Sequence, residues 1–281
     1  MKVLVTGANG QLGYDVIKRL NALGDEPVGA DREEFDITDK KATEDYITAL
    51  RPDAIVHCAA YTAVDKAEDD RDTCRKVNVD GTRNIALACE KIGAKLVYIS
   101  SDYVFGGSGT QPLEIDAPKD PQNIYGITKL GGEEEAKKCQ KHFIVRTSWV
   151  FGINGGNFVK TMLRLADSHE KLTVVDDQTG SPTYTPDLAR LICDMIKTEK
   201  YGTYHASNEG YCTWAEFAKE IMRQAGKATE IVPCTTAEYP AKAKRPENSR
   251  LSKKCLDDAG FDRLPPWQDA LARFLKELDL A

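Results

Sequence analysis

A tyrosine and a lysine four residues apart, Tyr125 and Lys129, have the residue types and spacing for proton transfer. Four residues make about one helical turn, so both side chains would share one face of a helix. An ammonium beside a phenol favours the phenolate, and lowering the phenol pKa by about three units needs roughly 4 kcal/mol of differential interaction. The same spacing occurs at Tyr14 and Lys18, which we expect to lie on an ordinary helix surface. The surrounding elements must therefore distinguish the two pairs.

Length, charge and cysteine usage exclude several classes of protein. The 281 residues can form one large domain, or a large domain with a smaller lobe. The net charge of -6 argues against a nucleic-acid partner, because phosphate neutralisation needs clustered Lys and Arg. The eight cysteines are scattered, and the four histidines lack metal-ligand spacing, so we expect no bound metal. A magnesium ion stays conceivable but has no support in the sequence.

The apolar segments are short. The run Val3–Val5 near the N-terminus is too short for a signal peptide. Elsewhere the apolar runs fall below the roughly 18 residues that a membrane-spanning helix needs. Scattered thiols in apolar segments are typical of small core residues in a reducing compartment. We therefore expect a cytoplasmic protein without a membrane partner.

Three glycines, Gly7, Gly10 and Gly13, lie between a predicted strand at 2–6 and a predicted helix at 11–23. This order of strand, glycines and helix is the dinucleotide-binding fingerprint, although the spacing is Gly-x-x-Gly-x-x-Gly. Glycines let the backbone approach a pyrophosphate, which then lies on the amides at the helix N-terminus. The segment predicts a phosphate-binding loop.

The second predicted strand, 27–30, ends at Asp31 and Arg32. An acidic residue about twenty positions beyond the glycines normally accepts hydrogen bonds from the adenine-ribose hydroxyls of NADH. The adjacent guanidinium could instead pair with the 2′-phosphate of NADPH. The sequence leaves both cofactors open.

Further predicted strands at 52–60, 95–100 and 142–146 alternate with helices. This alternation predicts an α/β fold with a doubly wound parallel sheet of the Rossmann type, whose ligands lie at the carboxyl ends of the strands. Ser101 follows one such strand, and the small residues Ala59 and Ala60 end another. We expect a dinucleotide-binding domain at 1–150 and a mainly substrate-binding lobe at 151–281, whose segments can interleave with the first domain. Asn78, inside a predicted helix, either makes a polar contact to a neighbouring strand or has no role.

The motifs together resemble the extended short-chain dehydrogenases/reductases, and within them the dTDP-4-dehydrorhamnose reductase branch. The motifs are Thr6-Gly-Ala-Asn-Gly-Gln-Leu-Gly13, Ala59-Ala-Tyr-Thr-Ala-Val-Asp-Lys-Ala-Glu68, Ser101-Asp-Tyr-Val-Phe105, Tyr125-Gly-Ile-Thr-Lys129, Arg146-Thr-Ser-Trp-Val-Phe-Gly152, Asn157-Phe-Val-Lys-Thr-Met162, Asp177-Gln-Thr-Gly-Ser-Pro-Thr183 and Arg245-Pro-Glu-Asn-Ser-Arg-Leu251. The first four are shared with many sugar-nucleotide reductases and epimerases. The last four are more specific to the rhamnose branch.

The resemblance implies a role for each matching residue. Tyr125 would give a proton to a keto oxygen, Lys129 would lower the pKa of Tyr125 and hold the nicotinamide ribose, and Ser101 would hydrogen-bond the same oxygen. The implied cofactor positions, for NADPH or NADH, are Gly7, Gly10, Gln11, Leu12, Gly13, Asp31, Arg32, Asp36, Ile37, Ala59, Ala60, Tyr61, Tyr125 and Lys129. The implied substrate positions are Ser101, Asp102, Trp149, Asn157 and Arg245, the last because a guanidinium can fork two phosphate oxygens.

The expected activity is reduction of the C4 keto group of a nucleotide-linked 4-keto-6-deoxyhexose, which gives dTDP-L-rhamnose. The protein is expected to be a monomer or a homodimer. One alternative is another nucleotide-sugar reductase, an epimerase or a dehydratase. A dehydratase of this superfamily would carry a glutamate after Asp102, where this chain has Tyr103. A second alternative is a non-catalytic subunit that resembles the regulatory subunit of methionine adenosyltransferase. Intact Ser101, Tyr125 and Lys129 do not exclude that role.

Overall fold

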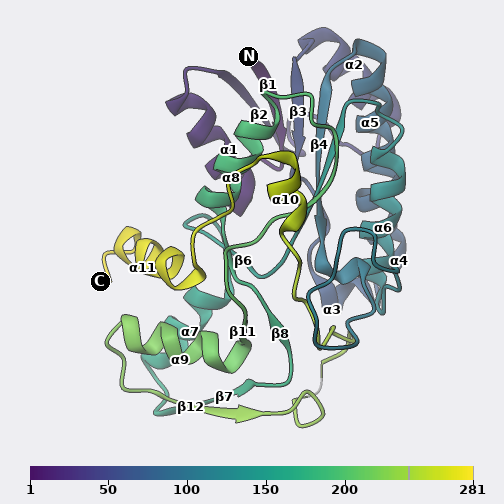
Figure 1. The fold of residues 1–281 in the computed structure, drawn as a ribbon. Coiled ribbons are helices and arrows are strands. Elements are labelled where there is room, and N and C mark those ends of the chain that lie inside the picture. The colour runs from purple at the N-terminus through teal and green to yellow at the C-terminus, as the bar shows by residue number, and fades with distance from the viewer. Residues whose placement is uncertain (240, 281) are drawn as a thin grey trace.

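A six-stranded parallel sheet forms the centre of the molecule (Figure 1), in a computed structural model that describes residues 1–239 and 241–280. Its strands run in the order β10-β5-β4-β3-β1-β2, and all neighbours are parallel. Their bounds are β1 Lys2–Thr6, β2 Glu26–Ala30, β3 Ala54–His57, β4 Lys95–Ser101, β5 His142–Thr147 and β10 Gly202–His205. The predicted doubly wound α/β fold is confirmed.

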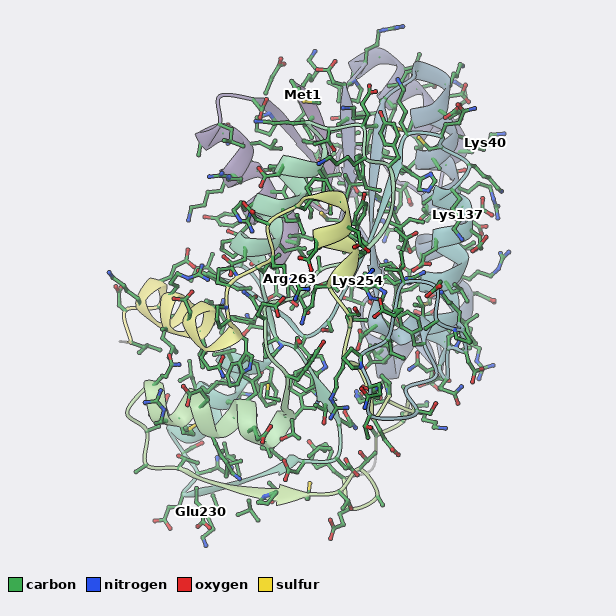
Figure 2. All side chains as sticks on the ribbon, viewed as in Figure 1. Met1, Lys40, Lys137, Glu230, Lys254 and Arg263 are labelled. Carbon is green, nitrogen blue, oxygen red and sulfur yellow. The ribbon has the colours of Figure 1, made fainter. Side chains whose placement is uncertain are left out.

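Helices cover both faces of this sheet, because successive strand residues point to opposite sides. Val3 and Val5 of β1 pack with α1 (Gln11–Ala22) and α8 (Thr185–Met195) in one core. Leu4 packs on the other face, in a core that includes residues of α2 (Lys40–Leu50), α5 (Thr82–Ile92) and α6 (Ile124–Ala136). Charged side chains such as Lys40 and Lys137 point outward (Figure 2). The inner strands β1, β3, β4 and β5 are therefore buried on both faces, as is usual in parallel sheets.

Two helix starts follow from side-chain caps. Asp39 accepts a hydrogen bond of 2.9 Å from Ala42 N at the start of α2. Asn123 accepts one of 2.8 Å from Gly126 N at the start of α6. The α6 cap fixes the start of the helix whose first turn contains Tyr125.

The long helix predicted around Asn78 is three segments, which are α4 (Arg71–Arg75), the π-helix η1 (Lys76–Gly81) and α5. Asn78 is buried, and its amide bonds both backbone groups of Tyr61, accepting from N at 2.8 Å and donating to O at 3.1 Å. A π-helical turn often marks a functional site. Asn78 therefore makes a polar contact with the loop after β3, rather than with a strand.

The C-terminal part forms a smaller lobe and returns to the sheet. A separate core, rich in aromatic side chains, holds this lobe together. Short strand pairs, β7–β12, β8–β11 and β6–β9, complete it. The remaining elements are α3 Val64–Ala67, the 3-10 helix η2 Asp102–Val104, β6 Val150–Phe151, α7 Phe158–Ala166, β7 Lys171–Val175, β8 Thr179–Gly180, β9 Thr183–Tyr184, β11 Cys212–Thr213, α9 Trp214–Gln224, β12 Glu230–Cys234, α10 Lys254–Ala259 and α11 Trp267–Glu277.

Strand β10, which the sequence pattern does not predict, pairs with β5 as the sixth strand of the sheet. It follows α8, which packs on α1 against the sheet. We propose that the dinucleotide-binding unit therefore includes residues 185–205 in addition to 1–150. Among the described residues, none of the helices is long and apolar enough to span a membrane.

Candidate active site

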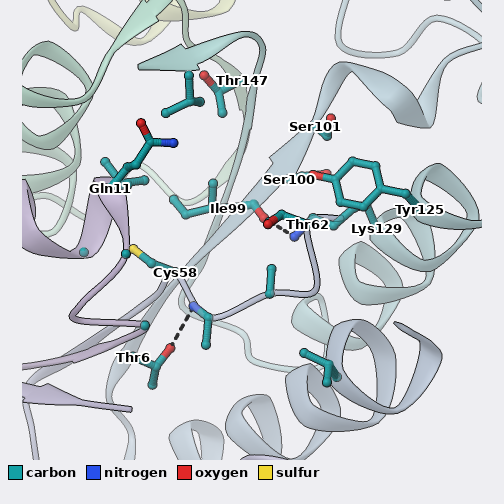
Figure 3. Close-up of a pocket in the computed structure, with 18 of the residues that line it drawn as sticks. Thr6, Gln11, Cys58, Thr62, Ile99, Ser100, Ser101, Tyr125, Lys129 and Thr147 are labelled. Atoms are coloured by element: carbon teal, nitrogen blue, oxygen red, sulfur yellow. Dashed lines mark hydrogen bonds between the residues drawn. The ribbon is translucent and has the colours of Figure 1, made fainter. Parts of the chain in front are cut away.

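A cleft of about 1010 Å³ lies at the carboxyl ends of the sheet strands, with Trp149 and Trp214 on its lobe side. Its lining includes every predicted site residue except Tyr61, Asn157 and Arg245. Figure 3 shows Tyr125, Lys129 and Ser101 on one side of this cleft and Gln11 on the other. The topology thus brings together residues from the first 150 positions of the chain.

The glycine loop is built for close approach of the backbone. Gly7 has φ +67°, and a Cβ there would lie 2.7 Å from Ala59 N. A Cβ on Gly13 would lie 2.1 Å from Gly7 O. Both positions therefore require glycine. Helix α1 begins at Gln11 without a side-chain cap, so its first amides and positive dipole end can take an anionic group.

Asp31 and Arg32 lie together at the end of β2. One carboxylate oxygen of Asp31 accepts a hydrogen bond of 2.9 Å from Asn9 N in the glycine loop. The Arg32 side chain is 89% exposed and makes a long ion pair of 3.8 Å with Asp36. Both residues line the cleft, so the geometry is compatible with either NADH or NADPH.

Lys129 is buried in the second turn of α6. Its Nζ donates a hydrogen bond of 2.6 Å to Ile99 O (Figure 3) and lies 4.4 Å from the centre of the Tyr98 ring. Burial lowers the pKa of Lys129 to about 8, while the nearby Glu133 charge opposes this shift. The ammonium is therefore held in place and loses its proton at a pH only slightly above neutrality.

Tyr125 lies one turn earlier, in edge contact with the Tyr103 ring at 5.4 Å between centroids. Burial raises the pKa of Tyr125 above its usual value, and an interaction with Ser101 opposes this only in part. The family resemblance implies instead that Lys129 lowers this pKa. In the structure the net direction of the shift is upward, because desolvation of the phenol dominates. A lowering contribution from Lys129 stays a prediction. The phenol is therefore protonated at neutral pH, which suits a proton donor.

Ser101 and Asp102 are buried at the end of β4. Ser101 Oγ donates to Asp102 Oδ1 at 2.8 Å and accepts from Tyr103 N at 3.2 Å. Burial raises the pKa of Asp102 to about 6, against the hydrogen bond from Ser101. Asp102 Oδ2 has no hydrogen-bond partner among the described residues. Asp102 lines the cleft, but this oxygen is itself buried, so a ligand hydroxyl would reach it only after the side chain rotates.

Trp149 has a left-handed backbone, with φ +50°, and stacks on Trp214 at 3.7 Å between ring centroids. Both indoles line the cleft. Trp214 was not identified from the sequence, since it lies 65 residues further along the chain. Thr147, a cleft residue at the end of β5, was also not identified from the sequence. Its Oγ1 has no hydrogen-bond partner in the described part of the chain. Trp214 lies in none of the motifs quoted above, whereas Thr147 lies in the Arg146–Gly152 motif but was not singled out from it.

The comparisons with known proteins agree with this geometry. A family model described as the RmlD substrate binding domain matches residues 1–280. The crystal structure of a dTDP-4-dehydrorhamnose reductase from Clostridium acetobutylicum is similar at TM-score 0.97 and 42% identity, covering 99% of this chain and 100% of that one. The chain belongs to the RmlD family of dTDP-4-dehydrorhamnose reductases. The sequence-based assignment to this family of oxidoreductases is confirmed.

Two further relatives of this RmlD-family chain are informative. A dTDP-4-dehydrorhamnose reductase from Bacillus anthracis, solved in complex with NADP, is 45% identical at TM-score 0.96, covering 98% of this chain and 99% of that one. The spore coat polysaccharide biosynthesis protein SpsK of Bacillus subtilis is 44% identical, covering 98% of this chain and 97% of that protein. The nicotinamide cofactor expected from the sequence agrees with the NADP of the first relative.

Three residues that the family resemblance placed at ligands lie outside the cleft lining. Tyr61 donates its hydroxyl to Asp70 at 3.2 Å. Asn157 caps α7 through Lys160 N and donates to Gln11 Oε1 at 3.0 Å. The Arg245 guanidinium forks the Asp65 carboxylate at 3.1 and 2.7 Å. Ligand contacts at these three positions remain predictions.

The second tyrosine–lysine pair is on the surface of this RmlD-family protein. Tyr14 is 43% exposed. The ammonium of Lys18 lies 3.4 Å from a carboxylate oxygen of Glu277.

Among the described residues, there is no cluster of three or more His, Cys, Asp or Glu side chains that could hold a metal ion.

Proposed function

We propose that this protein reduces the C4 keto group of dTDP-4-dehydro-β-L-rhamnose to dTDP-L-rhamnose, with NADPH or NADH. The proposal rests on one observation above all, which is that Tyr125, Lys129 and Ser101 line a cleft that also contains the glycine loop. Relatives of 42% and 45% identity carry the name of this activity.

The cleft residues fit a dinucleotide. Gly7 and Gly13 leave no room for a side chain, and the uncapped start of α1 supplies amides for a pyrophosphate. Asp31 or Arg32 would hold the adenosine end, and Ala59 and Ala60 would leave space for the cofactor to cross the sheet. When bound, the nicotinamide supplies the hydride that reduces the sugar carbon.

Tyr125 would donate the proton to the keto oxygen. Its raised pKa keeps the phenol protonated at neutral pH, and its place in the first turn of α6 is fixed by the Asn123 cap. A hydrogen bond from Ser101 to the same oxygen would stabilise the negative charge that develops there. For this bond, Ser101 would turn its proton from Asp102 to the substrate.

Lys129 would hold the nicotinamide ribose and stabilise the phenolate that Tyr125 becomes. Its charge lies in a buried environment, where electrostatic interactions are stronger than in water. The ammonium has further N–H groups besides the one bound to Ile99 O. A single buried lysine can therefore serve both roles.

The sugar nucleotide would lie between the catalytic residues and the indoles of Trp149 and Trp214. Asp102 Oδ2 would accept a hydrogen bond from a sugar hydroxyl. Arg245 would contact the diphosphate after exchanging its ion pair with Asp65, a partly exposed carboxylate. In this arrangement the keto sugar would lie at Tyr125, Lys129 and Ser101, and the diphosphate of the substrate would lie at Arg245.

We further propose that the protein is cytoplasmic, since all eight cysteines are free thiols. The family resemblance adds that it acts as a monomer or homodimer. The proposed function is tested by NADPH oxidation with dTDP-4-keto-6-deoxy-L-lyxo-hexulose and with other nucleotide ketosugars. We expect the highest kcat/KM with the first compound. A higher value with another ketosugar would assign a different substrate. The absence of any turnover, with a stoichiometric protein partner in a pull-down, would favour a regulatory subunit.

A further inference from the structure

The helix that carries Tyr125 and Lys129 contacts β4 with a third residue of the same face. Glu133 lies one turn beyond Lys129, and its Oε1 accepts a hydrogen bond of 2.6 Å from Ser100 Oγ. Lys129 Nζ donates to the carbonyl of the preceding residue, Ile99, also at 2.6 Å. Two successive turns of α6 thus hold two successive residues of β4, immediately before Ser101.

Glu133 is fully buried and forms an ion pair with Arg146 of β5. The guanidinium donates through Nε to Oε1 and through Nη2 to Oε2, both at 2.7 Å. In the sheet, Arg146 is paired directly with Ser100. Burying two charges is costly, and a buried pair is weak evidence for a gain in stability. A pair at this position therefore calls for a functional reason.

Arg146 is itself held from three sides. Its Nη1 donates to Ile115 O at 2.8 Å and lies 3.3 Å from His205 Nε2 of β10. Its guanidinium carbon lies 5.1 Å from the centre of the Phe105 ring. Because Arg146 cannot move without breaking these contacts, the Glu133 carboxylate is fixed relative to the sheet.

We propose that Glu133, held by Arg146, is a positioning residue that fixes Lys129 and Ser101 in register and keeps Lys129 protonated. The catalytic role of Lys129 rests on the proposed function. The position of the carboxylate does not, since it follows from the contacts of α6, β4 and β5.

Among the described residues, the other titratable groups that face Lys129 do not supply a negative charge at neutral pH. Burial raises the pKa of Tyr98, whose ring centre lies 4.4 Å from Lys129 Nζ. Burial raises the pKa of Cys58, which follows β3, to about 12, and it also raises the pKa of Cys74 on α4. Burial lowers the pKa of His57 on β3 to about 3, so its imidazole is neutral. Tyr125 is protonated, as its raised pKa requires. Glu133 is therefore the carboxylate that opposes loss of the Lys129 proton.

The test compares Glu133→Gln with Glu134→Gln, a matched control on the exposed face of α6, where Glu134 pairs with Lys137. The titration of Lys129 is followed by NMR with ¹³C-labelled lysine, the signal being assigned by its loss in Lys129→Arg. We expect the pKa of Lys129 to fall by about one unit in Glu133→Gln, which makes its protonated fraction about tenfold lower at alkaline pH. Glu134→Gln should titrate as the wild type. An unchanged Lys129 pKa in folded Glu133→Gln would overturn the charge role.

Ser100→Ala tests the register, and it keeps the proposal testable if Glu133→Gln does not fold. The substitution removes the hydrogen bond between Ser100 Oγ and Glu133, which joins β4 to α6. It retains both charges of the Glu133–Arg146 ion pair. We expect a lower kcat, with an unchanged Lys129 pKa and an unchanged cofactor Kd. A wild-type kcat would overturn the register role. If the wild type reduces no ketosugar, the proposed function fails, whereas the lysine titration still decides on Glu133.

Discussion

The ammonium of Lys129 donates a 2.6 Å hydrogen bond to the carbonyl oxygen of Ile99, two residues before Ser101. This contact ties α6, which carries the proposed proton donor, to the strand that ends at the proposed keto-oxygen contact. Since Tyr125 lies one turn before Lys129 on α6, the bond also restricts the place of the phenol. Tyr125, Lys129 and Ser101 are thus held in one rigid unit at the edge of the cleft.

Replacing Tyr125 by Phe should lower kcat by roughly 100- to 10,000-fold, because the variant has no phenolic proton to donate. The Kd for NADPH, measured by fluorescence titration, should change little. Tyr14→Phe is the control, since its exposed side chain lies on the helix behind the glycine loop. Wild-type turnover in Tyr125→Phe, or an equal loss in Tyr14→Phe, would show that the wrong pair was assigned.

The activity should decline above about pH 8, where Lys129 loses its proton. Stability should change in the opposite direction. The folded pKa lies below the unfolded value of 10.5, so the unfolded chain binds more protons between these pH values. The contribution of Lys129 to the free energy of unfolding therefore rises from about pH 8 to 10.5. Rate and urea-unfolding profiles that decline together over this range would contradict the assignment.

Asp102 should control the acidic side of substrate binding. Its pKa is raised to about 6, so below that pH the carboxylate becomes a neutral acid and the KM for the sugar nucleotide should increase. Asp102→Asn should have a raised KM that no longer varies between pH 5 and pH 7, which are about one unit on either side of that pKa. If the variant keeps the pH dependence of the wild type, another group is responsible.

Asp31 and Arg32 should select between the two cofactors. Asp31→Ala should weaken NADH more than NADPH, because only NADH offers a free 2′-hydroxyl to the carboxylate. Arg32→Ala should weaken NADPH more, since it removes the guanidinium that would pair with the 2′-phosphate. Both Kd values can be measured by fluorescence titration of each variant. Equal losses for both cofactors would remove the ribose assignment.

Most of the sheet was predictable from sequence, because its strands are short apolar runs that alternate with amphipathic helices. Five of the six strands follow this pattern, and the sixth, β10, does not. The segment Gly202–His205 has only four residues and begins with glycine, so its Thr and Tyr, which favour strands, do not make a recognisable apolar run. It forms a strand because it pairs in parallel with β5 at the edge of the sheet.

The site was predictable where a motif is local, as at Gly7, Ser101 and Tyr125. It was not predictable where distant segments meet. The stacking of Trp149 on Trp214 depends on how the lobe folds over the sheet. The direction of the Tyr125 pKa depends on desolvation, which residue spacing does not reveal.

Hydride delivery to C4 of the sugar is the central claim, and isotope transfer tests it most directly. The protein is incubated with dTDP-4-keto-6-deoxy-L-lyxo-hexulose and NADPH that carries deuterium at the reactive C4 position of the nicotinamide. We predict that NMR of the product will show dTDP-L-rhamnose with deuterium at C4 of the sugar. A product with deuterium at another carbon, a different configuration at C4, or no deuterium at all would contradict the claim.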